Sequence, residues 1–196
     1  MYKKQLLFQK IVCFAMLAAA ALVFLYSLGI MTDLYDSLYS TMRNPDDYTD
    51  SSVAGSIIYY DMQPFNTTFT NISIGLIIVT LILFLTNTHS RRKYYIGNYI
   101  ATGLSVICNI AVSVWALSEI SAYRAQYLQI DFEALKAHSE LWKTYYTDST
   151  FWFDVSYCVF GLLLVLTVLL VVNLVLKILM MKEEKRLIGT RKEMKA

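Results

Sequence analysis

Long apolar runs separated by polar segments form the main pattern of this chain. Four runs lie at about 11–31, 72–85, 94–120 and 155–176. A helix rises about 1.5 Å per residue, so about 20 apolar residues cross the roughly 30 Å hydrocarbon core of a bilayer. The second run is short and is expected to include residues 66–70. The pattern predicts an all-α, four-span transmembrane helical bundle that forms a single integral membrane domain.

The polar flanks set the expected limits of each segment. The expected segments are spans at 8–31, 68–88, 94–122 and 152–180, longer loops at 32–67 and 123–151, and a tail at 181–196. The first span could instead be a cleaved signal peptide. Its apolar run of about twenty residues exceeds a usual signal core, and no small-residue cleavage site follows it. An uncleaved span is therefore expected.

The composition agrees with a membrane protein, and the charges are partitioned along the chain. Hydrophobic residues make up 57% of the sequence, against about 45–50% in soluble domains. The amino-terminal stretch has Lys3, Lys4 and Lys10 and no acid, and residues 91–93 are all basic. Residues 32–70 hold six aspartates against Arg43 alone, and residues 123–154 hold five acids against three bases. The positive-inside rule predicts cytoplasmic termini, a cytoplasmic 91–93 link and outward-facing longer loops in a cell membrane.

The longer loops are expected to form a partly helical cap outside the membrane. Helical spacing continues past Met31, and residues 57–60 suggest either a short strand or a re-entrant turn. The third helix is expected to continue through 123–130, and an amphipathic stretch follows it.

Residues near both ends of the fourth helix predict where it begins and where it stops. One of Asp148, Ser149 and Thr150 is expected to cap its first turn. The helix is expected to run to about Leu187 and to stop at Gly189.

A stripe of small and polar residues follows one face of the third span. Thr102, Ser105, Asn109, Ser113 and Ala116 recur at three- to four-residue steps. Small residues let helices approach, and an amide in lipid seeks an interhelical partner worth about 0.6–2 kcal/mol. Packing inside the bundle is the favoured interpretation. A seam for another membrane subunit and a water-lined pore are the alternatives.

Other candidate contact residues lie on the first, second and fourth spans. Ala15 and Ala19 give the first helix a face that allows close helix packing. Gly75 is a weaker candidate for such packing on the second helix. Lys177, at the inner end of the fourth span, is expected to snorkel to the headgroups. The three cysteines, all within or beside spans, are expected to be packing residues without disulfides: Cys13, Cys108 and Cys158.

The candidate outer polar site consists of four charged residues. Glu119 and Asp154 lie near the outer ends of the third and fourth spans, where Arg124 and Lys143 can satisfy them. No ionisable residue falls near a predicted midplane, where such groups are costly and usually functional. This pattern does not favour an ion-coupled transporter.

No motif for catalysis, cofactor binding or nucleic-acid binding is found. His89 and His138 are expected on opposite sides of the membrane, so they do not form one metal site. The basic tail is expected to set topology and to contact anionic lipid. The sequence predicts a non-catalytic subunit or accessory component of a larger membrane complex, in a transport or cell-envelope assembly. The alternative is a small homo-oligomeric channel or facilitative transporter. The expected partners are the lipid bilayer and other integral membrane subunits or further copies of the chain.

Overall fold

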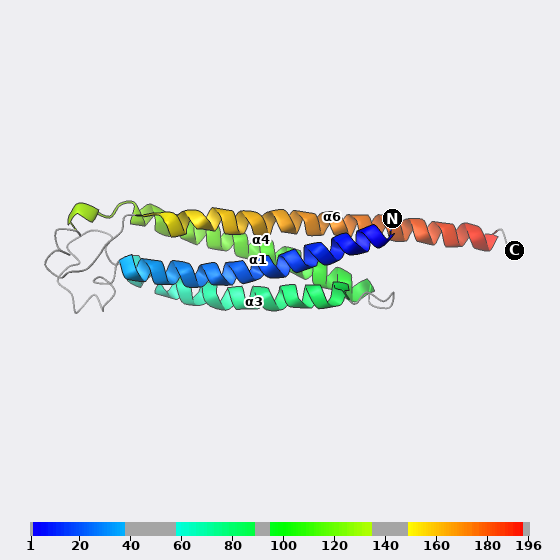
Figure 1. Cartoon of the computed structure of the whole chain (residues 1–196), viewed down its shortest axis with the longest axis horizontal. Helices are drawn as coiled ribbons and strands as arrows, with labels where there is room; N and C mark the ends of the chain where they lie inside the picture. Colours follow the sequence, from blue (N-terminus) through cyan, green and yellow to red (C-terminus); the bar gives the residue numbers. More distant parts are fainter. Residues whose placement is uncertain (1, 38–57, 89–94, 135–148, 194–196) are drawn as a thin grey trace.

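Four long helices lie side by side in the computed structural model, which describes residues 2–37, 58–88, 95–134 and 149–193 (Figure 1). The helices are α1 (Tyr2–Ser37), α3 (Gln63–Thr88), α4 (Tyr95–Tyr127) and α6 (Phe151–Glu193), and α2 (Ile58–Asp61) is one short turn. The all-α fold with four long apolar helices is thus confirmed. Four segments are long and apolar enough to cross a membrane: Lys3–Met31, Gln63–Thr88, Ile96–Tyr127 and Phe151–Ile188.

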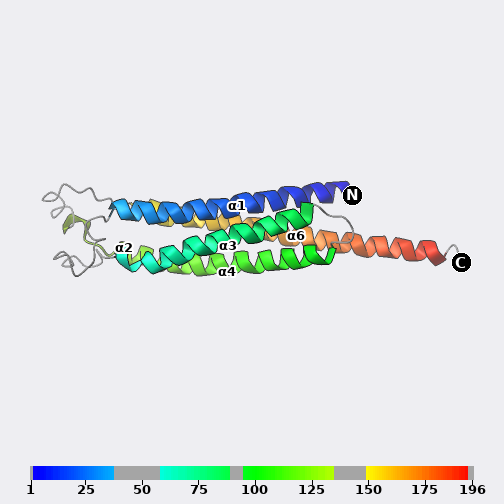
Figure 2. The same ribbon diagram turned by 90° about the horizontal axis from the view of Figure 1, so that it is seen from below.

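The four helices form a bundle in which each long helix has two neighbours. Helix α1 packs against α3 and α6, and α4 packs against the same two helices from the opposite corner. The two views show α1 and α4 starting at the same end of the bundle, where α3 ends (Figure 2). We call this the amino-terminal end. The other end, where α1 finishes and α2 lies, is called the α2 end.

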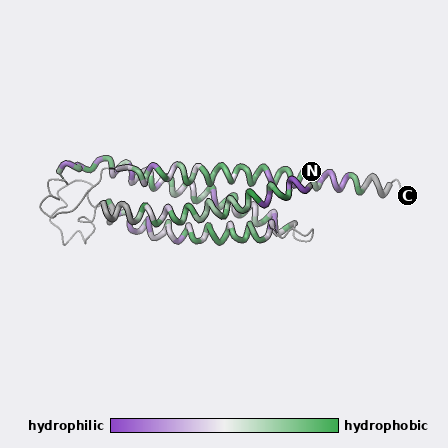
Figure 3. The backbone as a smooth tube through the Cα atoms, viewed as in Figure 1, coloured by the Kyte–Doolittle hydropathy of each residue, from purple (hydrophilic) through white to green (hydrophobic). Residues whose placement is uncertain are grey.

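Apolar side chains cover the outside of the bundle as well as its interior. Hydropathy is high along all four helices, and polar residues gather near the start of α1 and on the last part of α6 (Figure 3). On α4, the outward residues include Ile96, Ile100, Ile107 and Val114, each at least 65% exposed. Such a surface suits lipid, which is as apolar as these side chains. The described helices therefore define a multi-pass membrane protein.

The structure corrects two predictions about local structure. Residues 58–61 form the helical turn α2, so the short strand that was one alternative at 57–60 is wrong, while the re-entrant turn stays a prediction. Helix α6 continues through Gly189 to Glu193, so the predicted stop is wrong as well. A single glycine costs a helix only about 1 kcal/mol relative to alanine, which is too little to end a long helix by itself.

One of the three residues predicted to cap the first turn of α6 does so. The Ser149 hydroxyl accepts a hydrogen bond from the Phe151 amide at 3.2 Å, which satisfies a free donor of the first turn. Asp148 lies outside the described residues. Helix α4 ends at Tyr127, somewhat before the predicted limit at residue 130.

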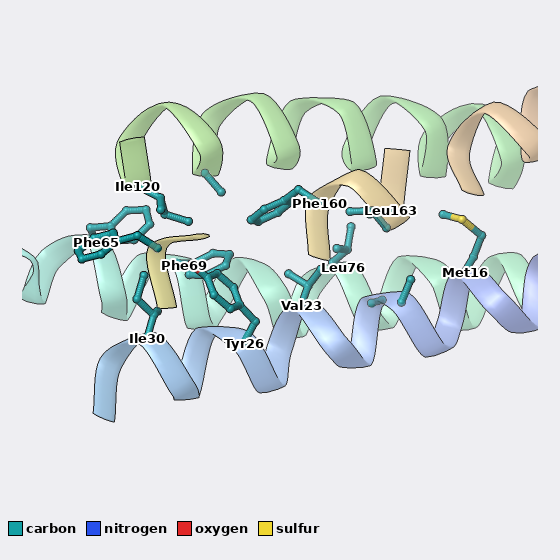
Figure 4. Packing of buried hydrophobic residues seen from close by; sticks show 14 of the residues in the cluster. Met16, Val23, Tyr26, Ile30, Phe65, Phe69, Leu76, Ile120, Phe160 and Leu163 are labelled. Carbon is teal, nitrogen blue, oxygen red and sulfur yellow. The ribbon is translucent and has the colours of Figure 1, made fainter. Parts of the chain in front are cut away.

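Aromatic side chains fill the core at the α2 end (Figure 4). Phe69 is fully buried, and its ring centroid lies 6.0 Å from that of Tyr26, 6.1 Å from Phe160 and 6.3 Å from Trp115. Phe65 lies 5.5 Å from Phe69 and 5.4 Å from Trp115. These separations are typical of favourable aromatic pairs. We call Tyr26, Phe65, Phe69, Trp115 and Phe160 the aromatic cluster.

Candidate functional site: the polar interior of the bundle

The polar stripe of α4 faces the interior of the bundle. Ser105, Asn109 and Ser113 are completely buried, as is Ala116, and Thr102 is 3% exposed. The structure therefore places these residues between helices of the same chain. The opposite face of α4 carries the exposed isoleucines and valine described above.

Asn109 forms a hydrogen bond between two helices near the middle of the bundle. Its Nδ2 donates to Thr167 Oγ1 on α6 at 3.1 Å, and the Thr167 hydroxyl donates to the Leu163 carbonyl at 2.8 Å. Because the single hydroxyl proton of Thr167 is used in this way, that oxygen must act as the acceptor toward Asn109. The amide orientation of Asn109 follows, and its Oδ1 points away from Thr167.

A second group of polar side chains, at the amino-terminal end, was missed by sequence reasoning. Gln5 Nε2 donates to Gln9 Oε1 at 3.1 Å and to Asn173 Oδ1 at 3.0 Å. Gln9 Nε2 donates to the Asn87 carbonyl at 2.8 Å. Together with Asn98, these five amide residues are at most 9% exposed. We call Gln5, Gln9, Asn87, Asn98 and Asn173 the amide cluster.

Lys177 lies against the amide cluster and is only 8% exposed. With the Asn98 amide oriented by its neighbours, its nitrogen donates to the Thr86 carbonyl at 2.6 Å and its oxygen accepts from Lys177 Nζ at 3.1 Å. Lys177 Nζ also lies 5.5 Å from the centroid of the Tyr99 ring, within cation–π range. The prediction that Lys177 snorkels to the headgroups is therefore wrong. Its ammonium group turns into the bundle because the amide and ring there solvate it.

The amide cluster had a weak sequence signal. Gln5 and Gln9 are one helical turn apart, and Asn87, Asn98 and Asn173 all lie near span ends. Each alone resembles an ordinary polar residue at a membrane boundary. Only the packing of α1 against both α3 and α6 shows that they meet.

The small-residue candidates on α1 and α3 have different surroundings. Ala19 is buried and Ala15 is half-buried on α1. A side chain added at Gly75 would meet nothing within 4 Å, so no close helix approach occurs there. The close approach is instead at Gly29, where an added Cβ would lie 2.4 Å from the Trp152 ring. The Trp152 carbonyl also accepts a hydrogen bond from the Tyr26 hydroxyl at 2.9 Å.

Two of the four outer polar candidates form an ion pair. Arg124 Nε donates to Asp154 Oδ1 at 3.0 Å, linking α4 to α6. Asp154 Oδ2 accepts a further hydrogen bond from the Thr150 hydroxyl at 2.6 Å. Glu119 is half-buried on α4. Lys143 lies outside the described residues.

The remaining chemistry-bearing residues are isolated. Cys13, Cys108 and Cys158 are free thiols, buried, half-buried and exposed respectively. Within the described part of the chain, no three His, Cys, Asp or Glu side chains gather as a metal site. His89 and His138 fall outside that part.

Comparisons with protein-family models, with curated proteins and with solved structures found no match to this chain. The class of the protein therefore follows from its four candidate spans, and its function is argued from its own residues.

Proposed function

We propose that this chain is a non-catalytic subunit or accessory component of a larger membrane assembly, in transport or in the cell envelope. The observation that carries the proposal is the far part of α6. Residues 182–193 continue the helix for about 18 Å beyond the Tyr99–Met181 contact with α4, and this part projects past the other helices (Figure 1).

The projecting part of α6 presents apolar side chains outside the bundle. Leu187 is 63% exposed and Ile188 is 48% exposed, and the basic residues Lys182, Lys185 and Arg186 precede them. Helices draw most of their stability from tertiary packing. A partner that covers Leu187 and Ile188 would supply that packing.

The proposed orientation places the amino-terminal end of the bundle in the cytoplasm. In the sequence, basic residues occur at the start of α1, in the 91–93 link that follows α3 and on the last part of α6, whereas acids predominate in 32–70 and 123–154. This distribution supports cytoplasmic termini and an outward-facing cap in the cell membrane. The projecting part of α6 would then meet a partner in the cytoplasm.

The alternative, a homo-oligomeric channel around α4, receives less support. A pore of that kind needs polar side chains on the face of α4 that meets other copies. That face carries Ile100, Ile107 and Val114, and the polar stripe lies inside the bundle.

Native mass spectrometry after mild detergent extraction tests the subunit proposal. We expect a second polypeptide in fixed stoichiometry, and we expect Leu187→Ser with Ile188→Ser to release it. The matched control is Val171→Ser with Val172→Ser, an exposed apolar pair within the span of the same helix. Retention of the partner by the first variant would contradict this use of α6. A ring of identical chains would favour the channel.

Thiol labelling in intact cells tests the orientation. Single cysteines replacing Asp47 and Lys136 should react with a membrane-impermeant reagent, whereas cysteines replacing Ser90 and Thr190 should react only after permeabilisation. The physical reason is the distribution of basic residues described above. Labelling of the second pair in intact cells would show that the orientation is inverted.

A further inference from the structure

Three polar atoms in the middle of the bundle have no hydrogen-bond partner among the described residues. They are Ser105 Oγ, Asn109 Oδ1 and Ser113 Oγ, and all three side chains are completely buried. The residues are spaced four apart on α4, so they lie on one face over two turns. A buried polar group without a partner is costly, and internal water is its usual partner in proteins.

The register between helices shows what surrounds these atoms. Asn98 reaches Thr86 on α3, and Trp115 contacts Phe69. Between these two contacts, the antiparallel packing of α3 and α4 places Ser105 level with Val79, next to Thr80, and Ser113 level with Asn71, two residues from Ser73. On α6, Thr167 contacts Asn109.

The surrounding hydroxyl groups offer acceptors and not donors. Thr80 donates to the Leu76 carbonyl at 2.9 Å, Ser73 to the Thr70 carbonyl at 2.7 Å and Thr167 to the Leu163 carbonyl at 2.8 Å. Each hydroxyl has one proton, so the remaining lone pairs of Thr80 and Ser73 can only accept, whereas Thr167 already accepts from Asn109. Asn109 Oδ1 requires a donor as well. Water supplies two donors per molecule.

The charges in the interior favour water over an ion. Among the buried residues of the described chain, Lys177 is the only charged side chain. Its positive charge disfavours a cation, and the acceptor oxygens disfavour an anion. A charge held in the membrane without an opposite partner would also be costly.

The two ends of this polar region differ in polarity. At the α2 end, Phe69, Trp115 and Phe160 close the interior beyond Ser113 with apolar rings. At the amino-terminal end, the amide cluster lines the interior with groups that can donate hydrogen bonds to water and accept them from it. Asn66, whose amide also lacks a partner, lies one turn beyond Phe69 toward α2 and is separate from this region.

We propose that Ser105, Asn109 and Ser113 hold a file of internal water molecules that is supplied from the amino-terminal end and closed by the aromatic cluster. The file reaches the middle of the membrane from one side only. This inference is independent of the partner proposed for α6.

Alkylation of single cysteines in the full-length chain tests the file. The background carries Cys13→Ala, Cys108→Ala and Cys158→Ala, and the test positions are Ser105→Cys, Asn109→Cys and Ser113→Cys in liposomes. Ala116→Cys is the matched control, because it is equally buried on the same face one turn beyond Ser113. Iodoacetamide is small and neutral, and it reacts only with the thiolate form of cysteine. Internal water favours the thiolate at the test positions, whereas the apolar surroundings of position 116 disfavour it. We therefore expect alkylation on the order of tenfold faster at the test positions than at 116. Position 105 should react fastest.

A measurement on the wild-type chain covers the case in which the cysteine variants misfold. With side-chain amides of asparagine labelled with ¹⁵N, NMR should show magnetisation transfer from water to the Asn109 amide protons, and Asn109→Leu identifies the resonance by its loss. No transfer from water would overturn the proposal, as would alkylation at all three positions as slow as at 116. Protection from alkylation by sodium would also overturn it, because a cation would then occupy the region.

Discussion

The two ends of the bundle interior hold the same four helices together by different means. At the α2 end, rings such as Phe69 and Phe160 pack without direction-specific bonds. At the amino-terminal end, Gln5 bonds to Asn173, and Asn98 contacts Lys177. In lipid, apolar burial contributes little to helix association, and packing and interhelical hydrogen bonds provide most of it. The comparison shows that ring packing dominates the α2 end, where the Tyr26 hydroxyl also donates to the Trp152 carbonyl, and that amide hydrogen bonds dominate the amino-terminal end.

Truncation in the aromatic cluster should have the largest effect. Phe69→Ala removes a fully buried ring that contacts all four other residues of the aromatic cluster, which come from α1, α3, α4 and α6. We expect the free energy of unfolding to fall by the lower end of about 3–5 kcal/mol. The cavity left by the ring destabilises the bundle, whereas the contribution from transfer of the ring out of water is small in lipid. Reversible unfolding in mixed micelles measures the free energy of unfolding. The control is Leu81→Ala, at a lipid-facing position of the same helix. Equal losses would mean that ring packing has no special role.

Removal of one amide should follow in size. Asn98→Leu deletes the acceptor of Lys177 Nζ and the donor to the Thr86 carbonyl. Hydrogen bonds to charged groups contribute about 1.5–3 kcal/mol, so we expect a loss in that range. The same unfolding assay applies, with Ile100→Leu as the lipid-facing control. If Asn98→Leu were neutral, the position of Lys177 would not depend on the amide.

The sequence predicted the four helices well because the bilayer imposes a length and an apolar composition on each span. It predicted Lys177 incorrectly because a single chain shows that a lysine is near a span end, but not which side chains of other helices converge on it. The amide cluster was missed for the same reason. Each amide looks ordinary within its own helix, and the four segments meet only through tertiary packing.

The close approach of α1 and α6 should be sensitive to one methyl group. Gly29→Ala places Cβ about 2.4 Å from the Trp152 ring, so the ring or a helix must shift. Overpacking of this kind costs about 1–3 kcal/mol. Gly75→Ala is the control, since nothing lies within 4 Å of an added Cβ there, and alanine raises helix propensity by up to about 1 kcal/mol. Thermal unfolding in detergent should therefore move in opposite directions for the two variants. Parallel shifts would contradict the described contact.

The outer carboxylates should show the smallest effect. Arg124 and Asp154 are 33% and 48% exposed, and exposed ion pairs contribute little to stability. Asp154→Asn keeps an oxygen that can accept from Arg124, and Glu119→Gln keeps the shape of its side chain. We therefore expect both variants to retain stability and partner binding, apart from modest assembly defects. An ion-coupled transporter would behave differently, because neutral substitutes do not bind and release charge. Proton- or sodium-dependent uptake by the purified chain alone in liposomes, abolished by either substitution, would move the functional site from the polar interior to these helix ends.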